Sequence, residues 1–559
     1  MPSFTLNGIE VPFEKGETIM QAADRVGIFI PRFCYHPALK IEGNCRMCLV
    51  DIEGGPPKLF SACSTQPQDG WVVHSNNEKV KKAVAGVLEF ILINHPLDCT
   101  ICDQAGECDL QDFAYMYGLS KSRYKGDKER KPKHKIIGPT LVHDAERCVL
   151  CGRCIRFLRD ITGTGELGLF KRGVRTEVDI YPGEQVDNPY SGNLADICPV
   201  GALTSRDFRF KARAWDLDHA ESICPDCSTG CNIRIDAVGG KVYKLDYQVY
   251  RIKARENTDV NGYFICDEGR FDYKWLNGPD RLWTSLILHG DHRDKIRTAA
   301  AIEQVAKALG EVVEKHGPES VAGIGNARST NEENWLLKKL VGEIVGSPNL
   351  DFIGGHGDVS EMEDELLRRK DKNPNSKGCQ DIGMVPAEGG KDLDAILAGV
   401  DSGEIKALVV LSVGHKMPED IRNRIADALK KVEVGVLVDC VTSDLSHNAD
   451  WTLASVAYAE THGTYTNYAG RVQRLGPTMP LGGEARPGWE LLRDLMSAMG
   501  EKVEYPSAWA VTREILENTP AYEGITMKDI GPRGAVKPEP EPEGAEEDKE
   551  TESESGDES

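Results

Sequence analysis

Alternating and helical patterns of apolar positions divide the start of the chain into short elements. Residues 3–16, SFTLNGIEVPFEKG, alternate apolar and polar side chains and are interrupted at Asn7-Gly8, which is typical of a β-hairpin with a tight turn. Residues 17–28 and, over a longer stretch, residues 77–94 repeat apolar positions at helical spacing. The pattern therefore predicts two strands followed by a helix, and a second, longer helix further along.

Apolar runs later in the chain are short and continuous. ALVVLSVG, residues 407–414, and EVGVLVDCVTS, residues 433–443, each end in a polar loop, which is typical of buried strands in a parallel α/β sheet. No run approaches the length of a spanning helix, and the first twenty residues lack a basic segment followed by an apolar one. We expect a cytosolic chain, or one that is bound peripherally to something in a membrane.

Length and charge narrow the possible function classes. The 559 residues carry a net charge of −22, and residues 537–559 alone hold eleven acids against two lysines. That segment has no aliphatic side chain larger than Ala545, so it cannot bury enough surface to fold alone and is predicted to be a disordered acidic tail. The acidic balance argues against nucleic-acid binding, which requires clustered lysine and arginine.

Cysteines are concentrated in one part of the chain. Fifteen of the seventeen lie between Cys34 and Cys266, and only Cys379 and Cys440 lie beyond. In a reducing compartment, such an abundance indicates metal or redox chemistry more than disulfides. Cys379 and Cys440 are interpreted as ordinary core or surface residues.

The fifteen cysteines and His95 form four groups of four candidate ligands. The groups are Cys34, Cys45, Cys48 and Cys63; His95, Cys99, Cys102 and Cys108; Cys148, Cys151, Cys154 and Cys198; and Cys224, Cys227, Cys231 and Cys266. CVLCGRC in the third group has the spacing of bacterial ferredoxins, and its distant cysteine precedes Pro199. Zinc sites favour two separated pairs, so the third group favours an iron–sulfur cluster, while zinc remains an alternative for the second and fourth groups.

Two features near these groups, a histidine and a set of arginines, each allow two interpretations. His95 follows the predicted helix and is either a ligand or a helix-end histidine near the last carbonyls. As a ligand, a neutral imidazole in place of a thiolate would raise the cluster potential. Arg153 lies within CVLCGRC, and Arg156 and Arg159 follow it at three-residue spacing. The three arginines either compensate the negative charge of a cluster or form a solvated helix face.

Each group sits in a setting that resembles a known protein family. Two strands, a helix and a cysteine loop resemble the β-grasp of plant-type [2Fe–2S] ferredoxins, although the first interval is ten residues instead of four. CPDCSTGC with YFICDEGRF resembles the cluster domain of molybdopterin oxidoreductases. All four groups, in this order, resemble the largest iron–sulfur subunit of the proton-pumping NADH:quinone oxidoreductase, complex I. The resemblance implies one [2Fe–2S] cluster on the first group and three [4Fe–4S] clusters on the others.

The second half resembles the molybdopterin-binding domains of formate dehydrogenases, in the segments at residues 323–359 and 461–474. Two departures indicate lost chemistry. Catalytic members carry a cysteine or selenocysteine just before a His-Gly-type pair, whereas this chain reads Gly354-Gly355-His356-Gly357. They also tend to carry a lysine where this chain has Glu268. No molybdopterin is therefore expected.

The predicted fold class is multidomain α+β and α/β, a β-grasp followed by cluster domains and a shortened molybdopterin-oxidoreductase-like α/β scaffold. The expected domains are 1–78, β-grasp [2Fe–2S]; 79–137, a [4Fe–4S] domain with one histidine and three cysteine ligands; 138–215, ferredoxin-like [4Fe–4S]; 216–280, molybdopterin-oxidoreductase-type [4Fe–4S]; 281–530, degenerate α/β scaffold; and 531–559, acidic tail.

The resemblance implies an electron relay. No GxGxxG motif follows a predicted strand, so the sequence shows no evident NADH or flavin site. Its expected partners are an NADH/FMN-binding subunit, a small [2Fe–2S] subunit and quinone-side subunits. Two alternatives stay open at this point. One is an electron-transfer subunit of a soluble NAD-linked hydrogenase or formate dehydrogenase, and the other is a zinc-stapled interaction scaffold.

Overall fold

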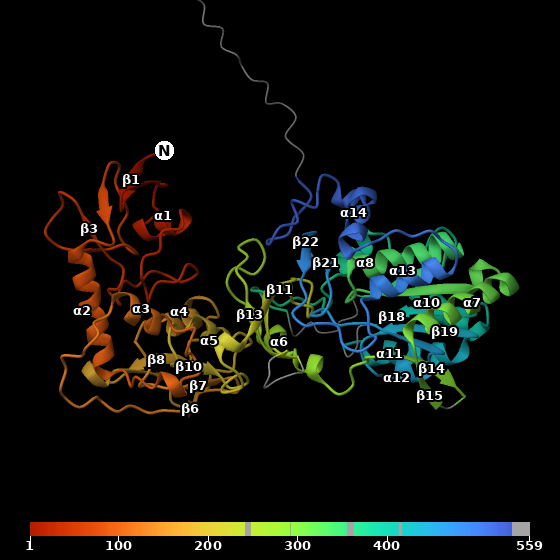
Figure 1. Cartoon of the computed structure of the whole chain (residues 1–559), viewed down its shortest axis with the longest axis horizontal. Helices are drawn as coiled ribbons and strands as arrows, with labels where there is room; N and C mark the ends of the chain where they lie inside the picture. The colour runs from red at the N-terminus through yellow and green to blue at the C-terminus, as the bar shows by residue number, and fades with distance from the viewer. Residues whose placement is uncertain (241–246, 291, 355–362, 413–415, 539–559) are drawn as a thin grey trace, which may run out of the picture.

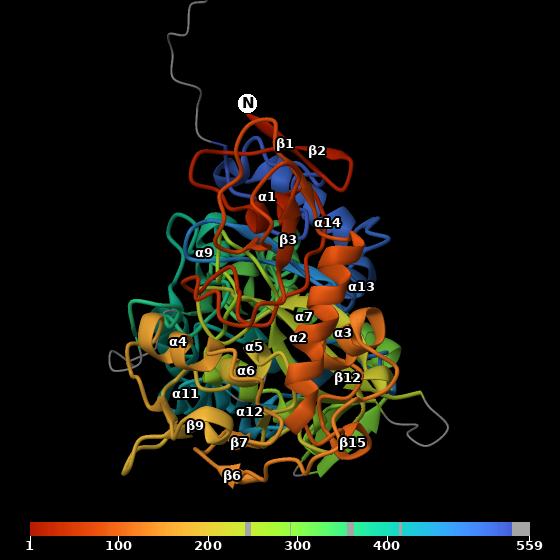
Figure 2. The same cartoon turned by 90° about the vertical axis from the view of Figure 1, so that its left-hand side faces the viewer.

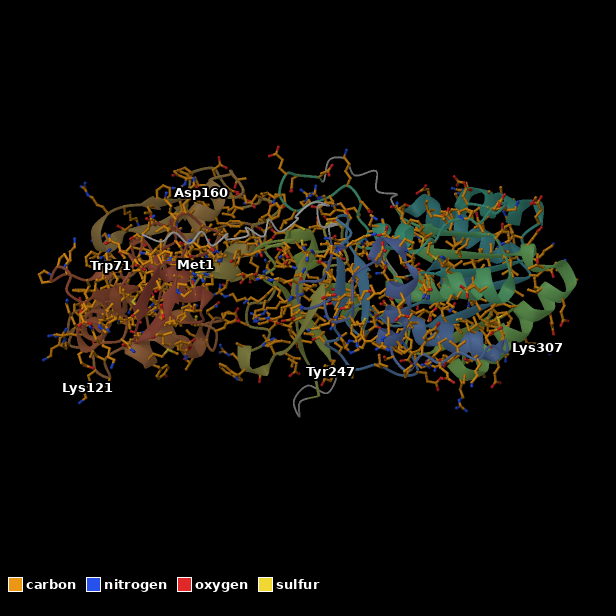
Figure 3. All side chains as sticks on the ribbon, turned by 90° about the horizontal axis from the view of Figure 1, so that it is seen from above. Met1, Trp71, Lys121, Asp160, Tyr247 and Lys307 are labelled. Carbon is orange, nitrogen blue, oxygen red and sulfur yellow. The ribbon has the colours of Figure 1, made fainter. Side chains whose placement is uncertain are left out.

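The computed structural model has two lobes that follow each other along its long axis (Figure 1). It describes residues 1–240, 247–290, 292–354, 363–412 and 416–538. Seen from above, Trp71 and Lys121 lie at one end and Lys307 lies at the other (Figure 3). The predictions for Gly355-His356-Gly357 and for the acidic tail from residue 539 fall outside the described residues.

The chain begins with a five-stranded sheet in the order β2-β1-β5-β3-β4. Its elements are β1 (Ser3–Leu6), β2 (Ile9–Pro12), α1 (Ile19–Arg25), β3 (Leu49–Ile52), β4 (Phe60–Ser61) and β5 (Val72–His74). Strands β1 and β2 pair antiparallel around Asn7 and Gly8, whose φ angles are 52° and 87°. The predicted hairpin is confirmed, because only residues that tolerate positive φ fit this turn.

A long helix connects this sheet to the segment that contains the second ligand group. Asn77 caps α2 (Glu78–Asn94) by accepting a 2.9 Å hydrogen bond from the Val80 amide. The predicted helix is confirmed, and it buries Val80, Val84 and Leu88. Figure 2, with the N-terminal lobe facing the viewer, shows α2 running along the front of that lobe, beside α3 (Asp109–Tyr117).

The rest of the N-terminal lobe is built from small sheets and short helices. A three-stranded sheet has the order β10-β7-β6, and β8 pairs with β9. The elements are β6 (Lys135–Ile136), β7 (Leu141–His143), α4 (Arg153–Asp160), β8 (Leu167–Phe170), β9 (Glu177–Ile180), α5 (Asn193–Ile197) and β10 (Leu203–Ser205).

An antiparallel meander joins the two lobes, in the order β11-β12-β13. Its elements are β11 (Asp218–Ile223), β12 (Asn232–Val238), β13 (Gln248–Ala254) and α6 (Asp267–Phe271). Apolar residues of the meander pack in one cluster with residues of the C-terminal lobe such as Tyr458 and Tyr465.

The C-terminal lobe is a seven-stranded sheet with helices against it, in the order β15-β14-β20-β19-β18-β16-β17. The strands are β14 (Ser285–His289), β15 (His292–Ile296), β16 (Val321–Asn326), β17 (Leu350–Ile353), β18 (Ala407–Leu411), β19 (Val434–Asp439) and β20 (Trp451–Ala454). Neighbours from β20 to β17 are parallel. Every residue of β18 and β19 is buried, so both predicted strands are confirmed.

Helices and one hairpin complete this lobe. They are α7 (Thr298–His316), α8 (Asn331–Lys338), α9 (Ser376–Asp381), α10 (Leu393–Ser402), α11 (Glu419–Lys431), α12 (Asp444–Asn448), β21 (Gly463–Thr466), β22 (Val472–Leu475), α13 (Gly488–Ala498) and α14 (Ala508–Asn518). Among the described residues, no helix combines the length and apolar character needed to cross a bilayer.

Candidate metal centres

The first group lies in the loops of the N-terminal sheet. Cys48 directly precedes β3 and Cys63 closely follows β4, and the Ala62 amide donates a 2.8 Å hydrogen bond to the Cys48 carbonyl. The thiols of Cys45 and Cys63 hydrogen-bond to the Cys34 sulfur and lower its pKa. A hydrogen bond with Cys63 lowers the pKa of Cys48 to about 7. The structure thus brings all four sulfurs into one hydrogen-bonded set.

The second group spans the end of α2 and the start of α3. His95 is the C-cap that directly follows α2, Cys99 begins a 3-10 turn (Cys99–Ile101), and Cys108 precedes the first residue of α3. Burial lowers the pKa of His95 to about 4, which keeps the imidazole in the neutral form that binds metals.

A buried ion network holds the loop between His95 and Cys102. Arg147 is 2% exposed and donates to both oxygens of Asp98, over 3.0 and 2.7 Å. Lys133 forms a further ion pair with Asp98 at 3.3 Å. Arg147 immediately precedes Cys148, so this network also ties the second group to the third.

The third group surrounds a cavity. Cys148, Cys151, Cys154 and Cys198 all line it, together with apolar residues such as Val149, Val178 and Val200. Gly152 adopts a φ of 71° in the loop and lets α4 begin directly after it. Burial raises the pKa of Cys148 to about 12 and that of Cys151 to about 11.

The three arginines in and after CVLCGRC have different surroundings. Arg153 is 9% and Arg156 3% exposed, and both donate hydrogen bonds to backbone carbonyls. For these two, the solvated-face interpretation is wrong. The Arg159 side chain is 59% exposed and pairs with Asp160 at 2.9 Å, as that interpretation predicts. Asp160 lies on the outside of the lobe (Figure 3).

The fourth group joins the two lobes. Cys224 and Cys231 flank the loop between β11 and β12, and the Cys224 amide donates to the Cys231 carbonyl over 2.8 Å. Cys266 is the N-cap of α6, and its sulfur accepts a hydrogen bond from the Gly269 amide at 3.5 Å. The C-terminal lobe reaches the same loop, because Lys416 pairs with Asp226 at 2.6 Å.

Glu268 occupies the position where molybdenum enzymes tend to have lysine. It forms an ion pair with Lys372 at 2.9 Å, and both side chains are partly buried. A lysine is thus present beside the fourth group, but it comes from the C-terminal lobe and neutralises a glutamate.

The surroundings of the cysteines fit compact cofactors bound by thiolates. A Cβ on Gly201 would lie 2.2 Å from the Cys102 sulfur, and one on Gly269 would lie 2.6 Å from the Cys224 sulfur, so only glycine leaves room for the sulfur at these positions. Burial raises the pKa of most of these thiols, and a bound cation would offset that cost by stabilising the thiolates. Within the described ranges, no three His, Cys, Asp or Glu side chains converge tightly enough to hold a single metal ion.

Sequence reasoning missed several charged residues around these groups. Asp98, Arg147 and Asp226 lie within three residues of a candidate ligand, so proximity could have singled them out. Lys372 and Lys416 carry no such signal, because only the fold brings them to the fourth group. Cys379 and Cys440 are fully buried, Cys379 in the sheet core of the C-terminal lobe and Cys440 where the meander packs against it.

Five protein families match the chain in order. The match at residues 2–78 is described as "2Fe-2S iron-sulfur cluster binding domain", and that at 85–123 as "NADH-ubiquinone oxidoreductase-G iron-sulfur binding region". The others are "NADH-quinone oxidoreductase subunit 3, ferredoxin-like domain" at 138–204, "Molybdopterin oxidoreductase Fe4S4 domain" at 219–278 and "Molybdopterin oxidoreductase" at 381–498. This order confirms the predicted fold class.

Similar proteins bear related names. The 78 kDa mitochondrial subunit of NADH-ubiquinone oxidoreductase from Candida albicans is 30% identical over 92% of this chain and 85% of its own length. The G subunit of NADH-quinone oxidoreductase from Rickettsia felis is 41% identical over 62% of this chain and 50% of its own. The chain therefore spans about half the length of the Rickettsia protein.

Two solved structures are partly similar. A crystal structure of an NAD+-reducing [NiFe]-hydrogenase in the H2-reduced state has a chain that is 29% identical, with a TM-score of 0.35, over 38% of this chain and 90% of its own. Acetylene hydratase from Pelobacter acetylenicus is 12% identical, with a TM-score of 0.39, over 56% of this chain and 73% of its own.

Proposed function

This chain belongs to the family of NADH:quinone oxidoreductase iron–sulfur subunits, known as the G subunit in bacteria and the 75–78 kDa subunit in mitochondria, and from this premise we propose that it relays electrons between the NADH-oxidising and quinone-reducing parts of such an enzyme. The observation that carries the proposal is a match to a family member over nearly the whole chain, combined with four groups of candidate ligands that each lie inside one matched iron–sulfur region.

The sixteen candidate ligands would hold one [2Fe–2S] cluster on the first group and three [4Fe–4S] clusters on the others. The domain boundaries at residues 78, 137, 215, 280 and 530 belong to this proposal, since each cluster domain then contains one complete group. An iron–sulfur cluster accepts and releases one electron at a time, with a potential set by its ligands and surroundings.

The chain itself would supply dry, positively charged surroundings. Cys34, Cys108, Cys154, Cys198 and Cys266 share one apolar cluster, which is separate from the core of the first sheet. Such a continuous core excludes water from the space between the groups. Buried Arg147, Arg153 and Arg156 place positive charge there, which favours the reduced, more negative state of a cluster.

The proposed partners are an NADH/FMN-binding subunit, a small [2Fe–2S] subunit and quinone-side subunits on the cytoplasmic side of a bacterial inner membrane. A contact surface is available on the elements that carry the second group. Phe90, Leu97, Ile101, Tyr115 and Met116 are between 60% and 84% exposed there. Large exposed apolar side chains in one region are typical of protein interfaces.

We propose that the C-terminal lobe holds no molybdopterin. Glu268 is neutralised by Lys372. The side-chain nitrogen of the buried Asn331 on α8 also has partners on β21, because it donates to the hydroxyls of Thr464 and Thr466 over 3.1 and 3.0 Å. Polar groups that are already paired leave few donors for a polar cofactor, which favours a scaffold role.

Metal analysis of the anaerobically purified full chain tests the proposal. We expect about fourteen iron atoms with matching sulfide and little zinc, and low-temperature EPR of the dithionite-reduced protein with one [2Fe–2S] and several [4Fe–4S] signals. A colourless, zinc-loaded chain would support the interaction-scaffold alternative and overturn the relay. Copurification with hydrogenase or molybdenum subunits would instead favour the soluble NAD-linked alternative.

A further inference from the structure

Two arginines of α4 connect the backbone of the first group to that of the third. Arg153 donates from one terminal nitrogen to the carbonyl of Tyr35, over 2.7 Å, and from the other to the carbonyl of Ile197, over 3.2 Å. Tyr35 follows the candidate ligand Cys34, and Ile197 precedes the candidate ligand Cys198. The Arg153 guanidinium therefore connects two residues, each of which is next to a candidate ligand, one in the first group and one in the third.

Arg156 makes the more direct connection. A single nitrogen, Nη2, donates to the carbonyl of Cys34 over 2.5 Å and to the carbonyl of Cys151 over 3.2 Å. Its other terminal nitrogen donates to the carbonyl of Lys40 over 2.5 Å. Arg156 thus binds the backbone carbonyl of one candidate ligand in the first group, Cys34, and of one in the third group, Cys151.

The surroundings hold this guanidinium in place. The Arg156 side chain is 4% exposed, and its Nε lies 3.0 Å from a carboxylate oxygen of Glu42. That carboxylate packs against the loop of the third group, because a Cβ on Gly152 would lie 2.6 Å from it. Arg156 therefore has no room to adopt another position without separating the two loops.

Aromatic rings close the same junction from another side. The Phe157 and Phe264 ring centroids are 4.9 Å apart, and Phe264 stacks on His36 at 5.9 Å. These residues belong to α4, to the segment before Cys266 and to the loop of the first group. The junction is therefore dry as well as charged, and hydrogen bonds to a cation are strongest in such surroundings.

We propose that Arg156, supported by Arg153, is a positioning residue for electron transfer between the first and third centres, an inference that rests on the proposed relay function. It fixes the separation of the two ligand loops. It also places a guanidinium beside the backbone of both loops, where its positive charge, partly offset by the Glu42 carboxylate, stabilises the reduced state of each centre.

The geometry explains why arginine is used. A planar guanidinium carries several fixed donors and can reach three carbonyls at once, whereas an ammonium group is a compact point charge on a flexible stem. Arg156→Lys would keep the positive charge but lose the simultaneous hydrogen bonds to the carbonyls of both loops. The two effects of Arg156, charge and placement, are therefore separable.

The test uses the full chain, purified anaerobically, with three variants: Arg156→Met, Arg156→Lys and the matched control Arg159→Met on the same helix. Iron content and the EPR signals of the first and third centres are measured first. Redox titrations then give the midpoint potential of each centre. Freeze-quench EPR after flash reduction gives the rate at which electrons equilibrate between the two centres.

We expect Arg156→Met to lower both midpoint potentials and to slow the equilibration about tenfold, because small displacements of reacting groups are costly. Arg156→Lys should largely restore the potentials while the transfer stays slow. Arg159→Met should change neither quantity, since its side chain is exposed and paired with Asp160.

The inference is overturned if Arg156→Met keeps its clusters and behaves like Arg159→Met in both measurements. It is also overturned if Arg156→Lys transfers electrons at the unsubstituted rate, a result that remains decisive should the methionine variant not fold. Absence of EPR-active centres from the unsubstituted chain would instead refute the proposed relay itself.

Discussion

The two lobes of this molecule are stabilised in different ways. The N-terminal lobe consists of small sheets and short helices, and its main apolar cluster includes cysteines from every one of the four groups. The C-terminal lobe has a seven-stranded sheet with fully buried central strands, and aliphatic and aromatic side chains dominate its main core. One core is built around ligands and the other is not.

This difference indicates that the two lobes are stabilised by different terms, cofactor binding in one and burial of apolar surface in the other. Binding a structural metal contributes about 10 kcal/mol or more in small domains, which is comparable to the whole stability of a typical domain. We infer that the N-terminal lobe depends on its cofactors for folding. The C-terminal lobe should fold on burial of apolar surface alone.

Removing the cofactors from the chain should have the largest effect. Chelation of iron, or Cys154→Ser in the cavity of the third group, should unfold the N-terminal lobe and leave the C-terminal sheet intact. Limited proteolysis followed by mass spectrometry should then recover a fragment close to residues 281–530. Cys379→Ala removes an equally buried cysteine from the other core and should leave cluster content unchanged; equal digestion of both lobes after chelation would contradict the comparison.

Removing the fourth group should affect assembly more than turnover. Its loop is held by the C-terminal lobe, through Lys416 on Asp226 and a 2.9 Å hydrogen bond from the Ser228 amide to the Asp371 carbonyl. Replacing Cys224, Cys227, Cys231 and Cys266 by serine should lower the yield of folded chain. NADH:quinone turnover per assembled complex should stay close to normal. Lost turnover in an intact complex would place this centre on the electron path.

A buried glutamate should make the C-terminal lobe sensitive to pH. Burial raises the pKa of Glu333 to about 7 from its ordinary value of 4.5, so the folded state binds this proton more tightly than the unfolded state. The resulting stability is fully present below about pH 4.5 and is lost as the pH rises to about 7, a change of about 3 kcal/mol.

Glu333→Gln should abolish this dependence, because the amide stays neutral at every pH. The free energy of unfolding of the variant, compared with the unsubstituted chain in urea at pH 5 and pH 8, should show a relative gain at pH 8. Glu343→Gln, at a side chain that is 61% exposed, serves as the control. Parallel pH profiles for all three proteins would show that Glu333 titrates normally.

The smallest effect on the fold is expected at His95. His95→Cys replaces a neutral imidazole by a thiolate and should lower the midpoint potential of the second centre while keeping its iron. An EPR redox titration of the full chain measures this potential. If His95 is only a helix-end residue, the potential and the signal will not change.

Much of this architecture could be predicted from the chain alone, because it depends on neighbouring residues. Asn7-Gly8 forms the first hairpin through local φ preferences, Asn77 begins α2 at the predicted position, and the apolar runs in β18 and β19 form buried parallel strands. The candidate ligand groups rest on the same kind of signal, since most of their cysteine spacings are short and therefore local, but their role as ligands stays a prediction.

Tertiary structure alone decided which of the charged side chains are buried and which are exposed. Arg156 and Arg159 are three residues apart on one helix, yet one is buried among carbonyls more than 100 residues away in sequence and the other faces solvent. Lys416 likewise reaches Asp226 across 190 residues. A long charged side chain is either solvated or buried according to the partners that distant segments bring to it, and no local pattern records those partners.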